Sequence, residues 1–257
     1  MPERVKFAAT SGPMLAGVID VPEGAVRGWG VWSHGLTLGK DSVATARICK
    51  QLAAEGIGML RFDNLGLGDS EGDWGLGSFS NKVADTVRAC EFMAARGTPV
   101  DLLGGHSFGG AAALAAAVQV PEARAVVTVG APSEPSHAEH NYDSLISEVL
   151  EDGEAVWQVG GKALTLRRSF VEDVRNADIY DCVHSLGRPL LILHSPTDAV
   201  VGVQNASEVF RMARHPKSFV ALEGADHFLT GAGAAKRAAH IISAWVDQYL
   251  VGASNPT

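Results

Sequence analysis

VDLLGGHSFGGAAAL, residues 100–114, is the stretch that decides how this chain folds. A short apolar run passes through two glycines into an alanine-rich segment with strong helix propensity. Between the two stands Gly105-His106-Ser107-Phe108-Gly109, which matches the pattern Gly-x-Ser-x-Gly. In a strand-to-helix context this pattern predicts a tight, strained turn that projects the Ser107 hydroxyl above a sheet. Small residues are needed two before and two after Ser107 because the strand and helix backbones nearly meet there.

The alternation of strand and helix continues on both sides of this stretch. Apolar runs predict strands at residues 4–9, 14–21, 29–33, 57–62, 125–129, 190–194 and 218–222. Apolar residues at helical spacing predict helices at residues 42–55, 81–96, 204–214 and 234–250. We therefore expect an α/β fold with a mostly parallel sheet, helices on both faces, and functional residues at the carboxyl ends of the strands. The last residues, 251–257, are expected to be loose.

Between residues 132 and 185 this alternation breaks. Residues 142–151 and 170–175 have helical patterns, and residues 156–167 alternate apolar and polar side chains around Gly160-Gly161, which predicts a β-hairpin with a two-residue turn. The segment is not low in complexity, so it has its own small structure and is not a linker. We predict an inserted cap at 132–185 on a core formed by residues 1–131 and 186–257.

The composition is that of an ordinary globular chain with an acidic balance. At 257 residues, with 46% hydrophobic and 19% charged, the chain can form a single large α/β domain. The formal net charge of −8, without any run of lysines and arginines, argues against nucleic acid as a partner. The opening MPERVKFAAT lacks the apolar core of a signal peptide, and no apolar run is long enough to span a bilayer. We expect a cytoplasmic protein without a membrane partner, either a monomer or a homodimer.

Neither the cysteines nor the histidines suggest a metal site. The three cysteines are widely spaced, and Cys49 and Cys90 fall in helical patterns, so buried free thiols are expected. The nine histidines lack ligand spacing, and no phosphate-cradling or dinucleotide glycine pattern follows the first strands. We expect no metal and no cofactor.

Three predicted strand ends carry groups that act together in nucleophilic catalysis. Ser107 follows one strand, Asp198 follows the strand at 190–194, and His227 follows the strand at 218–222. A serine hydroxyl is a poor nucleophile at neutral pH, so it needs an imidazole to take its proton. The imidazole needs a carboxylate that fixes its tautomer and stabilises its charged form. Serine, acid and then histidine is also the chain order of α/β-hydrolases, so we predict a Ser107-His227-Asp198 triad.

Attack by the serine would place negative charge on a substrate oxygen, and this charge needs hydrogen-bond donors. His34-Gly35-Leu36 follows the third predicted strand, where this fold provides one backbone donor. We assign the oxyanion hole to the backbone N–H groups of Leu36 and Phe108.

Five motifs together resemble the α/β-hydrolase family over nearly the whole chain: HG at 34–35, RFDNLGLGDSEG at 61–72, GHSFGG at 105–110, HSPTD at 194–198 and GADHF at 224–228. More closely, the chain is similar to bacterial hydrolases found alone or fused to an OsmC-like domain. It also resembles the feruloyl and cinnamoyl esterases, which carry a small cap at the position of residues 132–185. The resemblance implies the α/β-hydrolase fold and hydrolysis of acyl esters, without fixing the acyl group.

Each of these residues also has a plainer interpretation. Ser107 could be an ordinary turn serine, His227 a surface histidine and Asp198 a turn-capping aspartate. Asp226 competes with Asp198 as the acid, although adjacent residues usually point in different directions, so it is the weaker candidate. His106 either donates to substrate or supports its loop, and support of the loop is the expectation.

The predicted substrate-binding residues are the least specific part of the site. His34 precedes the presumed oxyanion donor and either contacts substrate or supports the loop. His137, Tyr142 and Trp157 lie in the predicted cap and either line the acyl pocket or simply pack.

The predicted activity is that of a carboxylesterase acting on a small-molecule ester through an acyl-enzyme. The same triad also serves thioesters and other acyl substrates, so a thioesterase or another acyl hydrolase of this fold is the nearest alternative. A non-catalytic ligand-binding protein is the rival from another class. An interaction partner of a redox domain is a third possibility that the sequence neither supports nor excludes.

Overall fold

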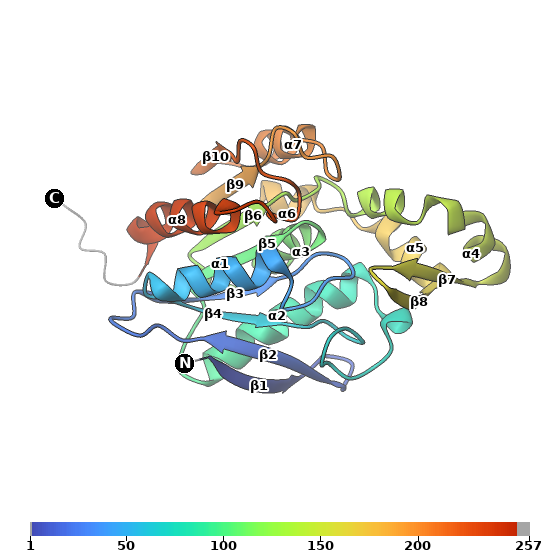
Figure 1. The fold of residues 1–257 in the computed structure, drawn as a ribbon, viewed down its shortest axis with the longest axis horizontal. Coiled ribbons are helices and arrows are strands. Elements are labelled where there is room, and N and C mark those ends of the chain that lie inside the picture. Colours follow the sequence, from blue (N-terminus) through green and yellow to red (C-terminus); the bar gives the residue numbers. More distant parts are fainter. Residues whose placement is uncertain (1, 251–257) are drawn as a thin grey trace.

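The computed structural model describes residues 2–250, and its centre is an eight-stranded sheet with the order β1-β2-β4-β3-β5-β6-β9-β10 (Figure 1). The strands are β1 (Glu3–Ala8), β2 (Met14–Asp20), β3 (Gly28–Ser33), β4 (Ile57–Phe62), β5 (Leu102–His106), β6 (Ala125–Val129), β9 (Leu190–His194) and β10 (Lys217–Ala221). Pairing is parallel from β4 to β10, whereas β2 is antiparallel to both β1 and β4. The predicted mostly parallel sheet is confirmed.

Helices cover both faces of this sheet. The helices of the core are α1 (Val43–Ala54), α2 (Phe79–Ala95), α3 (Phe108–Ala117), α6 (Tyr180–His184), α7 (Gln204–Met212) and α8 (Ala234–Val246). Buried side chains of α1 and α8 form one apolar cluster, and those of α2, α3, α6 and α7 form the other, on the opposite face. Figure 1 shows α1 and α8 in front of the sheet with α2 behind it.

The period of two in the strands explains why both faces are buried. In β9, Leu190 and Ile192 belong to one apolar cluster, while Leu191 and Leu193 belong to the other. Continuous apolar runs of this kind are typical of parallel strands between two helical layers. The strands and helices predicted for the core are therefore confirmed, with ends that differ by a few residues.

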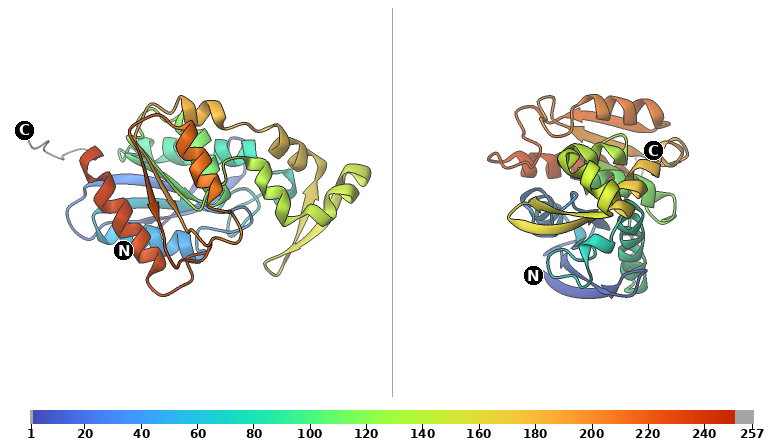
Figure 2. Two further views of the ribbon diagram at one scale, coloured as in Figure 1. Left: turned by 90° about the horizontal axis from the view of Figure 1, so that it is seen from above. Right: turned by 90° about the vertical axis from the view of Figure 1, so that its right-hand side faces the viewer.

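Between β6 and β9 the chain forms a second, smaller structure. Its elements are the 3-10 helices η2 (Pro135–Asn141) and η3 (Asp143–Leu145), α4 (Ile146–Asp152), the antiparallel strands β7 (Glu154–Val159) and β8 (Lys162–Arg167), and α5 (Arg168–Asn176). The predicted hairpin around Gly160-Gly161 is confirmed. Figure 2 shows the hairpin and α4 projecting beyond one end of the main sheet, whereas α6 packs on α3 and α7.

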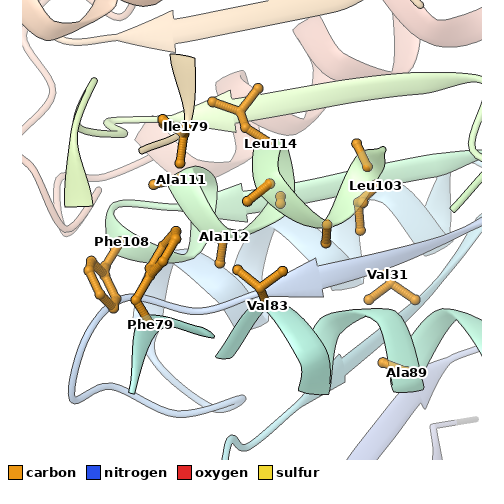
Figure 3. Packing of buried hydrophobic residues seen from close by; sticks show 14 of the residues in the cluster. Val31, Phe79, Val83, Ala89, Leu103, Phe108, Ala111, Ala112, Leu114 and Ile179 are labelled. Atoms are coloured by element: carbon orange, nitrogen blue, oxygen red, sulfur yellow. The ribbon is translucent and has the colours of Figure 1, made fainter. Parts of the chain in front are cut away.

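Aromatic side chains join this smaller structure to the core. Phe79 at the start of α2 meets Phe108 at the start of α3 with ring centroids 5.2 Å apart (Figure 3). Phe170 of α5 lies beside Phe108 and beside Trp74, which belongs to the 3-10 helix η1 (Trp74–Leu76). Trp157 of β7 contacts Trp74 in turn, at 5.8 Å between centroids. A chain of aromatic contacts thus connects the hairpin, through Trp74 and Phe170, to Phe108 at the start of α3.

Two further sequence expectations concern cysteines and membranes. Cys49 and Cys90 are buried and free, and Cys182 is free and partly exposed. Over residues 2–250, no helix combines the length and the apolarity that crossing a bilayer requires. The expectation about residues 251–257 lies outside the described residues.

Candidate active site

Ser107 sits on a strained turn between β5 and α3. Its backbone has φ 55° and ψ −131°, a positive-φ conformation that costs a non-glycine residue roughly 1–3 kcal/mol. A Cβ on Gly105 would lie 2.2 Å from the Gly109 carbonyl oxygen, and a Cβ on Gly109 would lie 2.2 Å from the Ser33 oxygen. Only glycine fits at these two positions, because the atoms in the way belong to the backbone. The close approach predicted from the Gly-x-Ser-x-Gly pattern is confirmed.

The structure brings Ser107, His227 and Asp198 into one hydrogen-bonded chain. The Ser107 hydroxyl lies 3.0 Å from Nε2 of His227 and can donate to it. Nδ1 of His227 lies 2.7 Å from Oδ2 of Asp198. Because an ionised carboxylate only accepts hydrogen bonds, the proton of a neutral His227 belongs on Nδ1, which leaves Nε2 free to accept from Ser107. The arrangement is competent for transfer of the serine proton to the imidazole.

Asp198 is held as a carboxylate. Burial opposes its ionisation, but hydrogen bonds from His227 and from the backbone N–H groups of Val201 and Val200 outweigh burial and lower the pKa of Asp198. These two N–H groups donate to Oδ1 over 2.9 Å each, so Oδ2 remains for His227. The carboxylate is therefore fixed in position on both of its oxygens.

The competing acid Asp226 has a different role. Its carboxylate accepts hydrogen bonds from the backbone N–H and the hydroxyl of Thr230, and it is exposed. It therefore closes the turn that follows His227. The two adjacent residues point their side chains to different partners, as expected from the sequence.

The N–H groups of Leu36 and Phe108 lie at the same site. Both residues line the cavity that contains Ser107 and His227. Within the part of the chain that the structure describes, neither N–H donates a hydrogen bond to a protein acceptor. A Cβ on Gly35 would lie 3.5 Å from Cβ of Ser107, so the loop that carries Leu36 runs directly against the serine. Two backbone donors are thus available beside the hydroxyl.

The cavity above Ser107 has a volume of about 840 Å³. His137 and Trp157, two of the predicted substrate-binding residues, line it from the segment between β6 and β9. The lining combines apolar residues such as Trp157 and Phe228 with charged residues of the loops that follow β3 and β4, among them Asp41 and Asp69. A small organic molecule with both apolar and polar parts fits such a lining.

His34 and Tyr142 do not line this cavity, so their assignment to substrate binding is corrected; for His34 the alternative, that it supports its loop, holds. His34 is fully buried, with Nδ1–H donating to the Gly35 carbonyl over 2.7 Å and Nε2 accepting from the Asn64 N–H over 3.2 Å. Tyr142 is 1% exposed and packs against Trp157 and Phe170. Both side chains are buried in the protein interior and do not face the cavity.

Two other buried histidines support the site. Nε2–H of His106 donates to the carbonyl oxygen of His227 over 2.7 Å. Burial, and then the neighbouring His227, lower the pKa of His106 to about 4, so its ring is neutral. His194, at the end of β9, donates from Nε2 to the Val201 carbonyl in the loop that holds Asp198. The expectation that His106 supports its loop is confirmed, whereas His194 was missed although it opens the HSPTD motif.

A mostly parallel eight-stranded sheet with a serine turn after β5, an aspartate after β9 and a histidine after β10 defines the α/β-hydrolase class. Residues 24–178, more than half of the chain, match the model of the family described as serine aminopeptidase, S33, and the chain belongs to this family.

Solved structures support the same assignment. The esterase domain of a Rhodothermus marinus protein is 36% identical, with a TM-score of 0.77 over 97% of this chain and 99% of that chain. Est1E from Butyrivibrio proteoclasticus with bound ferulic acid is 17% identical, with a TM-score of 0.80 over 95% and 98%. The dienelactone hydrolase from Anabaena variabilis is 19% identical, with a TM-score of 0.68 over 97% and 98%. The last two likenesses show the fold alone. None of the curated proteins compared matches the chain, and the resemblance to hydrolases fused to an OsmC-like domain stays a prediction.

Proposed function

We propose that the protein is a serine hydrolase that cleaves carboxylic esters through an acyl-enzyme intermediate. The observation that carries the proposal is the hydrogen-bonded chain from the Ser107 hydroxyl through His227 to the Asp198 carboxylate. The 36% identical esterase domain, aligned over nearly the whole chain, supports the choice of an ester as substrate. The ligand is a small molecule, and the mechanism needs no cofactor.

Acylation begins when Oγ of Ser107 attacks the ester carbonyl carbon. His227 takes the hydroxyl proton on Nε2, and Asp198 stabilises the resulting imidazolium through Nδ1–H. The carbonyl oxygen becomes an oxyanion that accepts hydrogen bonds from the N–H groups of Leu36 and Phe108. When the tetrahedral intermediate collapses, the bond to the alcohol oxygen breaks. His227 then returns its proton to this oxygen, so a neutral alcohol leaves.

Deacylation repeats these steps with water as the nucleophile. His227 removes a proton from a water molecule, which attacks the acyl carbon, and a second oxyanion forms in the same place. Collapse breaks the bond to Oγ of Ser107, which regains its proton from His227, and the carboxylic acid is released. In this proposal the hairpin residues above the cavity limit the access of other water and shape the acyl site.

Covalent labelling tests the proposal. The protein is incubated with a fluorophosphonate, and the intact mass is measured for the parent and for Ser107→Ala and His227→Ala. We expect one adduct on the parent, none on Ser107→Ala and a strongly slowed reaction for His227→Ala. Ser42→Ala is the matched control, because Ser42 lines the same cavity without belonging to the triad. An unlabelled parent, or labelling that persists in Ser107→Ala, would overturn the assignment.

A substrate panel then separates the reaction classes. p-Nitrophenyl esters, methyl hydroxycinnamates and acyl-CoA thioesters are compared by kcat/KM, with turnover of the oxygen esters expected to exceed that of the thioesters. The reverse order would replace the esterase by a thioesterase. Labelling of Ser107 with no turnover of any member would contradict catalysis and favour the ligand-binding alternative.

A further inference from the structure

The peptide group between Gly35 and Leu36 is held from behind. Its carbonyl oxygen accepts a hydrogen bond from Nδ1–H of His34 over 2.7 Å. The N–H of the same peptide belongs to Leu36, and in a trans peptide the carbonyl and the N–H point in opposite directions. The contact that fixes the carbonyl of Gly35 therefore also sets the direction of the Leu36 N–H at the cavity. A hydrogen bond to a carbonyl also polarises the N–H of its own amide and strengthens it as a donor.

His34 can hold this carbonyl because its tautomer is fixed. The backbone N–H of Asn64 donates to Nε2 of His34 over 3.2 Å, so Nε2 has to be the acceptor and Nδ1 carries the proton. Burial, and next the nearby charge of Lys82, keep the pKa of His34 well below its ordinary value. The ring is therefore neutral, with one proton placed on the Gly35 side.

Asn64 is fixed in turn by two side chains of α2. Nζ of Lys82 donates to Oδ1 of Asn64 over 2.5 Å. Nδ2 of Asn64 donates to Oδ2 of Asp85 over 3.1 Å, and the Leu65 N–H donates to the same oxygen over 3.4 Å. Lys82 is 5% exposed and Asp85 is 4% exposed. Both amide positions of the Asn64 side chain are thus occupied, which locks the loop after β4 in place.

A buried lysine of this kind is costly to the fold. Within residues 2–250 no carboxylate lies close enough to Nζ of Lys82 to form an ion pair, and burial lowers the pKa of Lys82 to about 7. An apolar side chain of similar size at such a position is often neutral or favourable for stability. Lys82 lies in the buried stripe of α2 with Thr86 and Cys90, which is otherwise suited to apolar packing. Nζ of Lys82 instead begins a series of hydrogen-bonded residues that runs through Asn64 and His34 to Gly35. Packing alone does not explain a lysine at this position.

We propose that Lys82 and Asp85, acting through Asn64 and His34, are positioning residues for the Leu36 N–H of the oxyanion hole. The inference rests on the proposed serine hydrolase function. None of the four side chains lines the cavity, so they act on the transition state through the backbone and not by contact with substrate. Removing one of these side chains should leave the Leu36 N–H less firmly oriented. Because complete loss of such a donor costs roughly 100- to 1000-fold in kcat, we expect a partial effect of about 10-fold.

The test uses Lys82→Met, which keeps much of the stem and removes the amine. Acylation is followed as p-nitrophenolate release from p-nitrophenyl butyrate, and we expect kcat to fall while KM changes by less than about twofold. Affinity for a trifluoromethyl ketone, which forms a tetrahedral adduct on serine, should fall by the same factor as kcat/KM. Cys90→Ala is the matched control, since Cys90 is buried on the same helix without a contact to this network. It should lower the melting temperature without changing kcat.

A double-mutant cycle with His34→Gln separates positioning from a general loss of stability. If Lys82 acts through His34, adding Lys82→Met to His34→Gln should cost little further activity. Equal losses of kcat in both backgrounds would overturn the proposed route. Asp85→Asn provides a second entry to the network if Lys82→Met fails to fold, and it should show the same split between kcat and KM.

Fluorophosphonate labelling keeps the two proposals distinguishable. A parent that is labelled on Ser107, together with Lys82→Met and Asp85→Asn at parental kcat, would overturn the positioning network and leave the hydrolase assignment standing. A parent that is not labelled would overturn both.

Discussion

His106 and His227 are joined across 121 positions of sequence by one hydrogen bond, from Nε2–H of His106 to the carbonyl oxygen of His227 over 2.7 Å. Their rings also lie side by side, with centroids 5.0 Å apart. The residue before Ser107 thus anchors the loop that carries His227, whose Nε2 lies 3.0 Å from the Ser107 hydroxyl. The turn after β5 and the loop after β10 are held together as one unit.

The burial of His106 predicts a pH-dependent stability, because burial and then the neighbouring His227 lower its pKa, whereas the hydrogen bond to the His227 carbonyl opposes this shift. His106 has an ordinary pKa of 6.5 and a folded-state pKa of about 4, so the unfolded chain binds a proton first as the pH falls. The stability contribution is complete above pH 6.5 and is lost towards pH 4, by about 3 kcal/mol in total. Urea unfolding of the parent at pH 7.5, 6 and 5 should show this fall. His106→Gln should flatten it, whereas His215→Gln, at an exposed position, should not. Equal slopes for the parent and His106→Gln would contradict the assignment.

The assignment of the acid predicts different outcomes for two aspartates. Asp198→Asn keeps the size of the side chain but removes the carboxylate that fixes the His227 tautomer, so kcat should fall on the order of 1000- to 10,000-fold. Asp226→Asn should stay within about threefold of the parent, because its carboxylate caps Thr230 and does not contact the triad. Steady-state hydrolysis of p-nitrophenyl butyrate measures both. Parental turnover by Asp198→Asn would remove Asp198 from the mechanism.

The packing of α3 against the end of β3 predicts that Gly109 cannot be replaced, even by alanine. In Gly109→Ala the new methyl would lie 2.2 Å from the Ser33 oxygen and 2.3 Å from the His34 oxygen, and backbone atoms cannot rotate away. We expect a loss of about 3 kcal/mol in the free energy of unfolding, together with lost activity. Gly231→Ala is the control, because a Cβ there meets nothing within 4 Å. Similar melting temperatures for the two variants would refute the close-packing argument.

Two neighbouring residues of β7 test how the hairpin is anchored. Trp157 is 6% exposed and contacts Trp74 and Tyr142, whereas Val156 is 60% exposed. Trp157→Ala should cost about 3 kcal/mol in unfolding free energy and raise KM for p-nitrophenyl hexanoate. Val156→Ala should stay within about 0.5 kcal/mol of the parent. If Trp157→Ala unfolds like the parent, aromatic packing does not hold the hairpin.

Most of the fold and of the candidate site could be predicted from local sequence patterns. Turn glycines and apolar periodicity locate the strands and helices of the core, because the sheet is parallel and buried on both faces. The serine, acid and histidine could be chosen because each follows a strand whose end meets the others at one edge of the sheet. Asp198 could be preferred over Asp226 because Asp226 is adjacent to His227, and adjacent side chains usually point in different directions.

Contacts between distant side chains were not predictable in this way. Lys82 is a charged residue next to Val83 in the predicted helix at 81–96, and a charged residue in such a pattern is usually exposed to solvent. It is nevertheless buried, and its amine donates to Asn64 in the loop after β4, a contact between residues that are distant in the sequence. The role of His34 stayed open between substrate contact and loop support for a similar reason, since the sequence does not reveal that Asn64 and Gly35 occupy both of its nitrogens. The short helices η1 and α6 carry too few residues for a periodic signal.

The hairpin has a consequence for how relatives of this chain can diverge. In the described chain β7 and β8 pair with each other and not with the main sheet, so side-chain packing and the flanking helices keep them over the cavity. Exchanging this module for one of different length or polarity leaves every ladder of the eight-stranded sheet intact. The triad geometry belongs to the sheet, whereas part of the cavity wall belongs to the hairpin. A change in this one insertion can therefore alter which molecules enter the cavity while Ser107, Asp198 and His227 keep their positions.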